Sequence, residues 1–347
     1  MKRINTVLLS YGMSGKVFHA PFLSVHGGFQ VRGAWERSKK VFAQDYPGTK
    51  SYASLESVLE DEEVELVIVN TPTNSHYEYA RKALLANKHV IVEKAFTTTV
   101  TEAEELKAIA EQRQRKLSVF QNRRWDSDFK TVKQVILAGL LGDIVEATLC
   151  FDRYNAGLSK KTHKENPGPG AGIVYDLVPH LADQALVLFG MPQAVFADFM
   201  INRPASRVED YFELLLYYNN FRVRLLAGYF KREPAPSYQI HGKLGSFFKS
   251  RADVQEASLL GGIKPNQTGY GIEPEEEQGL LHTEKDGVVM RERISTLPGN
   301  YMDYFEAVYK AITADASIPV SADDGINVMK IIEAAYTSHR ERKVVAI

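Results

Sequence analysis

One stretch in the first third of the chain constrains the fold more than any other. A run of apolar β-formers at 65–69 leads through a turn into a helical pattern at 75–87, and a second β-rich run follows at 88–92. Two strands joined by one helix form a βαβ unit, in which the strands are parallel. The unit ends at Glu93-Lys94. It therefore places a lysine beside a carboxylate at the carboxyl edge of a parallel sheet, where open α/β sheets bind ligands.

The first 121 residues repeat this alternation of strand and helix. Short runs rich in β-branched residues are separated by segments with helical periodicity, which is typical of a doubly wound parallel sheet. The expected strands lie at 4–9, 29–35, 65–69, 88–92 and 117–120, and the expected helices at 38–45, 54–60, 75–87 and 101–116. We therefore expect an α/β domain over residues 1–121.

The pattern changes after residue 121, and a chain of 347 residues is longer than one hydrophobic core usually supports. Alternating strands separated by turn signals predict a mostly antiparallel sheet with helices on one face. The expected strands lie at 143–153, 193–201, 210–218, 221–230, 236–241 and 244–250, and the expected helices at 127–138, 176–189, 301–314 and 323–341. Residues 252–300 are rich in Gly, Pro and Glu and allow no assignment. We expect an α+β domain over residues 122–347.

The composition restricts which kinds of partner the protein can bind and in which compartment it is expected. A formal net charge of −1 without a basic block argues against nucleic acid and against an acidic membrane surface as partners. No run approaches the roughly 20 apolar residues of a membrane span, and the apolar run at 7–9 is too short for a signal peptide. The single cysteine, Cys150, excludes an internal disulfide and is expected to be a small apolar strand residue. We expect a cytoplasmic protein.

The turn after the first expected strand has the pattern of a phosphate-binding loop. A dinucleotide fingerprint has the spacing G-x-G-x-x-G, in which Gly12 and Gly15 fill the second and third positions and Ser10 replaces the first. The second glycine lets the backbone approach a pyrophosphate, and the third lets the helix pack closely on the strand. Glu36, at the end of the next strand, completes the expected context, so we expect dinucleotide binding. The alternative is that the two glycines serve only a tight turn.

Glu36 bears on the choice between NAD and NADP. A carboxylate at this place accepts hydrogen bonds from the adenosine ribose hydroxyls and repels a 2′-phosphate, which favours NAD. Arg37 and Ser38 follow at once and could hold a 2′-phosphate if Glu36 turned away. The balance leans slightly to NAD and leaves NADP open.

Three residues carry groups that suit proton transfer. Oxidation of a secondary alcohol sends a hydride to NAD(P)⁺ and a proton to the protein. Burial and a nearby positive charge bring the pKa of a lysine such as Lys94 towards working pH, and a histidine starts near it. Asp176 and His180 lie four residues apart, so one helix presents both on one face. The alternatives are an ordinary surface pair, or a metal site with Asp183 and His163; we expect no metal, because a catalytic zinc usually has three close protein ligands of the N or S type.

Further motifs relate the chain to a known family. Over essentially its whole length the sequence resembles the Gfo/Idh/MocA oxidoreductases, named for glucose–fructose oxidoreductase and inositol dehydrogenase. The motifs that carry this resemblance are the fingerprint, Thr71-Pro72 with His76, Glu93-Lys94, and the segments 175–184, 240–246 and 318–325. Segments 18–22 and 121–126 are similar to the branch that contains NADP-dependent scyllo-inositol dehydrogenases.

The resemblance implies an N-terminal Rossmann domain and a C-terminal domain that binds substrate and forms oligomer contacts. It implies that Lys94 hydrogen-bonds the reacting hydroxyl and assists proton transfer, that His180 faces this hydroxyl, and that Asp176 orients or tunes the pair. Asn122, Arg123 and Trp125 are implied to lie where the two domains meet, and Thr71, Pro72 and His76 along the nicotinamide half of the cofactor groove. The expected cofactor-binding residues are Gly12, Met13, Ser14, Gly15, Glu36, Arg37, Ser38, Thr71, Pro72, His76, Glu93, Lys94, Asn122, Arg123 and Trp125, and the expected substrate-binding residues are Lys94, Trp125, Arg153, Tyr154, His163, Asp176 and His180.

Two positions depart from the family pattern. Ser10 replaces the first fingerprint glycine, and Ala95 replaces the proline that follows the family's Glu-Lys pair. The Lys–Pro peptide of that motif is often cis, whereas a cis bond before another residue costs about 3 kcal/mol. We therefore expect the Lys94–Ala95 peptide to be either trans or strained.

These observations lead to an expected function. We expect an NAD(P)-dependent dehydrogenase acting on CH–OH groups of a sugar, inositol or related polyol, because loop residues such as Arg153, Tyr154 and His163 would supply dense donors and acceptors. The alternative is a non-catalytic sugar sensor that binds dinucleotide on the same scaffold, for which Ala95 is the only hint. A third possibility is a dehydrogenase that retains its cofactor and cycles between two sugars. The resemblance also implies a homodimer or homotetramer formed through the open face of the second sheet.

Overall fold

The computed structural model describes residues 2–37 and 40–347. Its contacts divide the chain into two compact units. Unit 1 comprises Met1–Asn122, Gln255–Tyr270 and Asn300–Ile326, and unit 2 comprises Arg123–Val254, Gly271–Gly299 and Asn327–Ile347. Two segments from the second half of the chain therefore belong to unit 1.

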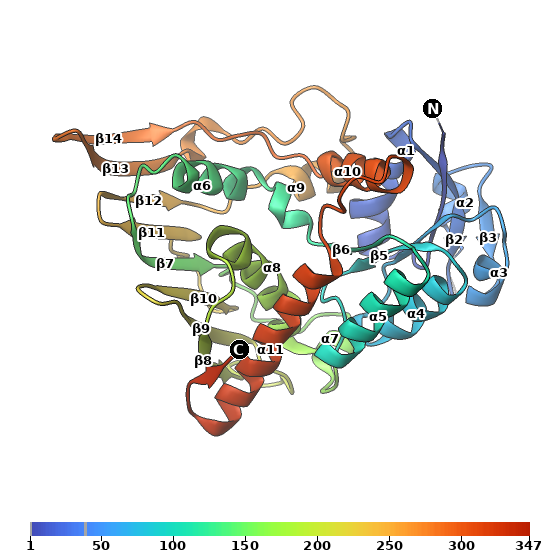
Figure 1. Cartoon of the computed structure of the whole chain (residues 1–347), viewed down its shortest axis with the longest axis horizontal. Helices are drawn as coiled ribbons and strands as arrows, with labels where there is room; N and C mark the ends of the chain where they lie inside the picture. The colour runs from blue at the N-terminus through green and yellow to red at the C-terminus, as the bar shows by residue number, and fades with distance from the viewer. Residues whose placement is uncertain (1, 38–39) are drawn as a thin grey trace. The chain divides into compact units, whose positions relative to one another are not determined.

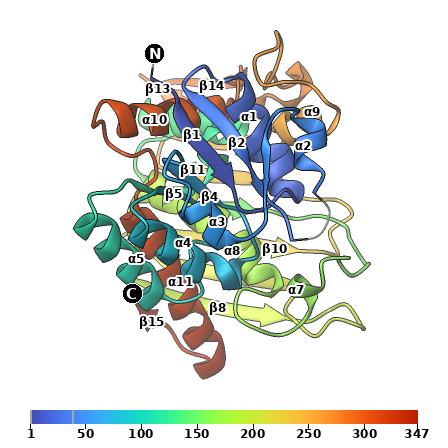
Figure 2. The ribbon, with the colours of Figure 1, turned by 90° about the vertical axis from the view of Figure 1, so that its right-hand side faces the viewer.

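Unit 1 contains a six-stranded parallel sheet. Its strands are β1 (Ile4–Leu8), β2 (Phe29–Trp35), β3 (Lys50–Tyr52), β4 (Leu66–Val69), β5 (His89–Glu93) and β6 (Leu117–Phe120), and their order is β3-β2-β1-β4-β5-β6. Figure 2 shows β1 and β2 side by side, as their pairing requires. Every residue of β4 and β6 is buried, so both faces of the sheet are covered. This confirms the expected doubly wound α/β fold.

The helices of unit 1 mostly match the sequence pattern, with two informative differences. The elements are η1 (Gly15–His19, a π-helical turn), α1 (Ala20–Val25), α2 (Phe42–Asp45), α3 (Leu55–Leu59), η2 (Thr73–Ser75), α4 (His76–Leu85), α5 (Val100–Gln112), α9 (Gln255–Leu260) and α10 (Met302–Thr313), with the short turn η3 (Asn122–Trp125) beginning at the end of the unit. The ranges expected for helices do not include 20–25, where α1 forms; its proline, Pro21, is tolerated because it lies in the first turn of the helix. The helix expected from 101 begins earlier, where Thr99 and Glu102 form a capping box.

Side-chain contacts explain why the late segments join unit 1. Phe305 of α10 stacks on Phe22 of α1, with ring centroids 5.4 Å apart. The hydroxyl of Tyr304 donates to Ser118 of β6 at 2.9 Å, and Ser118 in turn donates to the carbonyl of Val320 at 2.9 Å. The residues around 300–320 therefore complete the core on β6.

Unit 2 contains a nine-stranded mixed sheet. Its strands are β7 (Ile144–Cys150), β8 (Ala194–Met200), β9 (Tyr211–Tyr217), β10 (Arg222–Gly228), β11 (Tyr238–Gly242), β12 (Gly245–Lys249), β13 (Gly279–Lys285), β14 (Val288–Ile294) and β15 (Val345–Ala346), in the order β14-β13-β12-β11-β7-β10-β9-β8-β15. The pair β7–β10 is parallel and the other pairs are antiparallel. The expectation of a mostly antiparallel second sheet is confirmed, and the hairpin β13–β14 lies in the stretch that allowed no assignment.

Helices cover one face of this sheet. They are α6 (Ser127–Leu137), α8 (Gly172–Phe189) and the unit 2 part of α11 (Ala322–Glu341). The four-residue helix α7 (Thr162–Glu165) and the short turn η4 (Glu275–Glu277) lie in loops of the unit. Figure 1 shows α6 and α8 on the same side of the strands, where α8 contacts β7, β9 and β10. By length and composition α8 could cross a membrane, but 67% of it is buried inside the protein, as in the core helix of a globular domain. Along β8 and β9 buried and partly exposed residues alternate, so the opposite face of the sheet is open.

Candidate active site

The fingerprint loop follows β1 at the point where the strand order of unit 1 reverses. A Cβ atom at Gly15 would lie 2.5 Å from the carbonyl oxygen of Ser10 and 2.8 Å from the amide nitrogen of Asn70, so only glycine fits. Asn70, directly after β4, donates to the carbonyl of Ser10 at 2.8 Å. The loop is thus fastened between β1 and β4, which is the topological switch point of this sheet.

Gly12 has the opposite environment. A Cβ atom there would meet nothing closer than the hydroxyl of Ser10, at 3.6 Å. The hydroxyl of Ser10 accepts a hydrogen bond from the N–H of Gly12 at 3.2 Å, so the serine that replaces the first glycine supports the turn. The side-chain oxygen of Asn70 beside this loop is buried and has no hydrogen-bond partner among the described residues. An open glycine at the amino end of a helical turn fits the phosphates of a dinucleotide.

Glu93 holds this loop from the end of β5. Its carboxylate accepts hydrogen bonds from the hydroxyl of Ser14, from the ring of His19 at 2.9 Å and from the N–H of Lys94 at 3.2 Å. Burial alone would raise the pKa of Glu93, but the contacts with His19, Ser14 and Lys94 hold it below its usual value. His19 is itself fully buried and packs on Phe120, which gives it a structural role.

Glu36 caps a helix. Its two carboxylate oxygens accept hydrogen bonds from the N–H groups of Val41, at 3.1 Å, and Phe42, at 2.9 Å, at the start of α2. Arg37 beside it is exposed, and Ser38 lies outside the described residues. Both oxygens of Glu36 are therefore already used by the backbone, which the sequence pattern did not indicate.

His76 joins the loops that follow β4 and β5. Its Nε2 lies 2.8 Å from the carbonyl oxygen of Thr71, and its Nδ1 lies 2.8 Å from that of Ala95. The ring is buried, and burial lowers its pKa despite these carbonyl contacts. The Lys94–Ala95 peptide bond is cis. His76 thereby fixes the backbone next to Lys94, and Thr71 and Pro72 lie in the same loop cluster.

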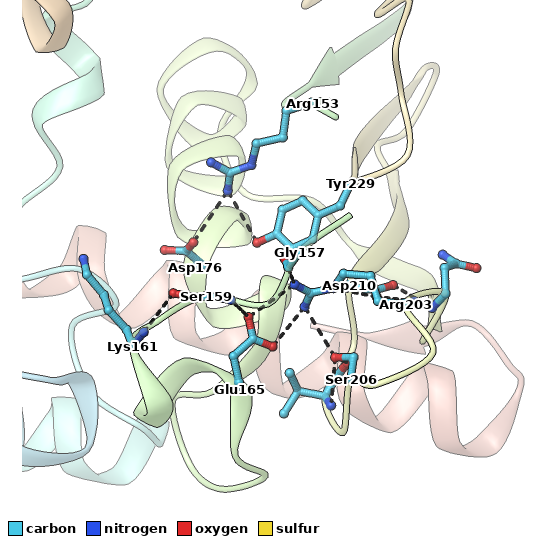
Figure 3. Close-up of polar contacts among 12 residues, drawn as sticks. Arg153, Gly157, Ser159, Lys161, Glu165, Asp176, Arg203, Ser206, Asp210 and Tyr229 are labelled. Carbon is cyan, nitrogen blue, oxygen red and sulfur yellow. Dashed lines mark hydrogen bonds and ion pairs between the residues drawn. The ribbon is translucent and has the colours of Figure 1, made fainter. Parts of the chain in front are cut away.

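In unit 2 a cavity of about 160 Å³ surrounds the carboxylate of Asp176. Lys164 donates to Asp176 Oδ1 at 2.7 Å. Figure 3 shows the guanidinium of Arg153, which lies 3.8 Å from Asp176 Oδ2 and 3.4 Å from the hydroxyl of Tyr229. The cavity is lined by Arg153, Asn155, Ser159, Lys161, Lys164, Glu165, Gly172, Ile173, Asp176, Arg203, Val208, Glu209 and Tyr229. A carboxylate between two cations thus lines a pocket rich in hydrogen-bond donors and acceptors.

His180 lies one turn further along α8. It is 6% exposed, and its ring lies nearly parallel to that of Phe151 with centroids 6.5 Å apart. The guanidinium of Arg123 lies 5.0 Å from the centroid of the same Phe151 ring. Asp183, one further turn along, accepts two hydrogen bonds from Arg124 at 2.8 and 2.6 Å. Within the part of the chain that the structure describes, no group of three His, Cys, Asp or Glu side chains is placed to hold a metal ion.

Not all expected substrate residues line this cavity, and some that do were missed. Tyr154 instead packs on Phe230 and under the guanidinium of Arg232, which lies 3.7 Å from the ring centroid, and His163 is exposed on α7. Met13 is 42% exposed beside the fingerprint. Asn122 is buried and Trp125 is partly exposed in the turn η3. The cavity residues that the sequence pattern did not indicate include Lys164, Arg203 and Tyr229.

Comparison with known proteins agrees with this architecture. Residues 4–121 match the oxidoreductase family with an NAD-binding Rossmann fold, and residues 133–347 match the C-terminal alpha/beta domain of the same family, GFO_IDH_MocA. The chain is 38% identical to scyllo-inositol 2-dehydrogenase (NADP(+)) IolW of Bacillus subtilis over 100% of this chain and 97% of the relative. It is 35% identical to the uncharacterized oxidoreductase YdgJ of Escherichia coli, over 99% of both chains.

Solved structures of oxidoreductases are also similar to this chain over its whole length. An oxidoreductase from Bacteroides fragilis is 43% identical with a TM-score of 0.91 and full coverage of both chains. The oxidoreductase yvaA from Bacillus subtilis is 38% identical with a TM-score of 0.96, covering 100% of this chain and 99% of that one. With both domain patterns matched and full-length relatives well above 30% identity, the chain belongs to the Gfo/Idh/MocA family of oxidoreductases.

Proposed function

We propose that this protein is an NADP-dependent oxidoreductase that transfers a hydride between the nicotinamide and a secondary alcohol of a polyol such as an inositol. The observation that carries the proposal is the cavity around Asp176, in which a carboxylate lies between Lys164 and Arg153 on the helix that also bears His180. A full-length relative at 38% identity is a scyllo-inositol 2-dehydrogenase (NADP(+)).

The proposed roles follow from the chemistry of alcohol oxidation. The bound dinucleotide supplies the hydride acceptor. Lys94, as the neutral amine, accepts the proton of the reacting hydroxyl, and His180 hydrogen-bonds the polyol. Asp176 accepts a hydrogen bond from a neighbouring hydroxyl, since its carboxylate is held in a fixed orientation by Lys164.

The charge of the cavity favours a neutral substrate. Four cationic side chains line the cavity, and three carboxylates line it as well. A fourth carboxylate, that of Asp210, accepts a hydrogen bond from Arg203 and balances the remaining charge. A phosphate or carboxylate on the substrate would find no net positive field. A neutral ring with several hydroxyls can use the same groups as donors and acceptors.

The preference for NADP rests on Glu36. A carboxylate that caps α2 with both oxygens is turned to the backbone, so it is less able to bind the ribose hydroxyls that distinguish NAD. The exposed guanidinium of Arg37 is suited to a 2′-phosphate. We expect Arg37→Ala to weaken NADPH binding at least about tenfold and to leave NADH binding within about twofold, because removal of one charge-assisted contact costs about 1.5 kcal/mol or more. Equal losses for both nucleotides in a fluorescence titration would contradict this assignment.

A substrate screen tests the reaction itself. The purified protein is mixed with NADP⁺ or NAD⁺ and a panel of inositols, aldoses and sugar acids, and reduced nucleotide is followed at its absorbance band. We expect turnover with a neutral polyol. Lys94→Met should lower kcat by about 100-fold or more while nucleotide affinity stays within about twofold, because general acid–base assistance contributes about 10²–10⁴-fold.

Lys107→Met is the matched control, since Lys107 lies on α5 and pairs with Asp323 on the surface. No turnover across the panel, together with normal nucleotide binding, would favour a sensor over an enzyme. The single buried thiol of Cys150 fits the reducing cytoplasm that we propose as the compartment.

A further inference from the structure

A buried arginine fastens the wall of the cavity around Asp176. Arg203 follows β8, is 3% exposed, and uses all five of its N–H donors (Figure 3). Nε donates to Asp210 at 3.0 Å. Nη1 donates to the carbonyl of Gly157 at 3.0 Å and to Glu165 at 3.2 Å. Nη2 donates to the other oxygen of Glu165 at 3.0 Å and to the hydroxyl of Ser206 at 3.4 Å.

These contacts join two loops that no strand pairing connects. The first loop, residues 155–165, links β7 to α8; the second contains Arg203 and Asp210 and links β8 to β9. Glu165 also accepts the N–H of Ser159 at 2.7 Å, so the guanidinium indirectly fixes the middle of the first loop. Asp210 is fully buried and accepts the N–H groups of residues 202 and 203, which anchors the second loop.

The first of these loops, residues 155–165, contains Lys164, which hydrogen-bonds the carboxylate of Asp176. Lys164, which donates to Asp176, is the direct chain neighbour of Glu165 on the four-residue helix α7. The guanidinium carbon of Arg203 also lies over the ring of Tyr229, 4.8 Å from its centroid, and the hydroxyl of Tyr229 contacts Arg153. Arg203 therefore contacts one residue next to each of the two cations that flank Asp176: Glu165 beside Lys164, and Tyr229 beside Arg153.

We propose that Arg203 is a positioning residue for substrate binding, which sets Lys164 and Arg153 around Asp176 through Glu165 and Tyr229. The inference deepens the proposed function and rests on it for its kinetic test. Only a planar fork with five donors satisfies this set of acceptors; the ammonium of a lysine has three donors and cannot bridge both oxygens of Glu165 while reaching Asp210. A positive charge at position 203 is therefore not enough to hold the two loops together.

The test replaces the fork and keeps the charge. In Arg203→Lys we expect KM for the polyol to rise at least about tenfold and nucleotide affinity to stay within about twofold, because the loss of two charge-assisted contacts loosens only the substrate wall. Amide hydrogen exchange at Ser159 and Lys161 should become at least about tenfold faster, because these N–H groups depend on Glu165 and on the loop that it holds.

Arg222→Lys is the matched control. Arg222 also stacks on a tyrosine, with its guanidinium 4.4 Å from the ring centroid of Tyr217, and donates to the backbone carbonyls of Tyr218 and Phe221 in the β9–β10 turn. It does not line the cavity. We expect KM and the exchange of Ser159 to remain at wild-type values in this variant, although its unfolding midpoint can fall.

A second variant covers the case in which Arg203→Lys does not fold. Glu165→Gln keeps the shape of the side chain, weakens its pairing with Arg203 and should raise KM and amide exchange in the same direction. If Arg203→Lys or Glu165→Gln is folded and leaves both KM and the exchange of Ser159 unchanged, the inference is overturned. If the wild-type protein turns over no substrate, the proposed reaction fails, and the exchange measurement alone decides whether Arg203 positions the loop.

Discussion

Two glycines three residues apart have opposite environments, and this difference can be measured. Gly12 has free space around it and does not have a left-handed backbone, so Gly12→Ala should leave the free energy of unfolding unchanged or raise it by up to about 1 kcal/mol. The same substitution should weaken NADPH binding at least about tenfold, because the methyl group occupies the space of the phosphates. Gly15→Ala should instead cost about 1–3 kcal/mol of stability, since its Cβ would meet Ser10 and Asn70. Denaturant unfolding and a nucleotide titration separate the two effects; a Gly12→Ala protein with wild-type affinity would rule out phosphate binding at this loop.

Single residues divide into those that a local motif indicates and those that only the fold brings into contact. Glycine spacing indicated the fingerprint, and the four-residue spacing indicated that Asp176 and His180 share a helix. Arg203 and Glu165 lie 38 residues apart, and no spacing relates them. Glu36 was expected at the ribose, but its role as the cap of α2 depends on the path of the following loop. Long-range hydrogen bonds of this kind have no sequence period.

At the scale of elements, periodicity identified the buried strands and long helices and failed where an element is short or exposed. The strands β4 and β6 are apolar throughout, so they were recognised from composition alone. The hairpin β13–β14 was missed because its second strand is largely exposed, and its apolar residues Val288, Val289 and Met290 are consecutive, so they do not alternate with polar residues. One signal was present: Asp286 and Gly287 form its turn with positive φ angles of 52° and 75°, and Asp-Gly is a strong hairpin dipeptide.

The pairing of β5 with β6 should respond to pH through His89. The N–H of Lys116 donates to Nδ1 of His89 at 2.9 Å, and burial with the nearby charge of Arg115 lowers the pKa of this histidine to about 4. In the unfolded chain it titrates near 6.5, so between pH 6.5 and 4 the unfolded state binds more protons and the native state loses stability as the pH falls. The loss is at most about 3 kcal/mol and smaller after screening by solvent.

His89→Gln should flatten this part of the stability curve relative to the wild type, whereas His282→Gln, at an exposed position of β13, should not. Urea unfolding at pH 4.5, 5.5 and 7 measures the difference. A wild-type and a His89→Gln curve with the same slope between pH 6.5 and 4 would show that His89 is not held neutral.

At the scale of the whole molecule, the two compact units do not correspond to the first and second parts of the chain. The sequence pattern changes near residue 121, and the strands on each side of that change form separate sheets. Yet Gln255–Tyr270 and Asn300–Ile326 pack within unit 1, where α10 and the residues near Val320 cover β6. The sequence pattern predicts the helix at 301–314 but does not say which sheet that helix will cover, and it allows no assignment for residues 255–270. This choice depends on the complementarity of two distant surfaces, here the aromatic contacts of Phe305.

The open face of the second sheet gives the last prediction, which concerns assembly. Leu215 on β9 is partly exposed there, directly opposite Phe196 of β8, and on its other side it faces Arg224 of β10. A protein that buries this face against a second copy needs about 800 Å² from each partner. Leu215→Glu can pair with Arg224 in the free sheet, so it should keep the fold and the near-ultraviolet circular dichroism while shifting the mass measured by light scattering from a dimer or tetramer to the monomer. Leu137→Glu, on the covered side at a 75% exposed position of α6, should leave the mass unchanged. A wild-type protein that is monomeric at all concentrations would contradict the expected assembly. A Leu215→Glu protein that stays assembled would place the contact elsewhere, because burial of the new carboxylate in an apolar interface costs several kcal/mol.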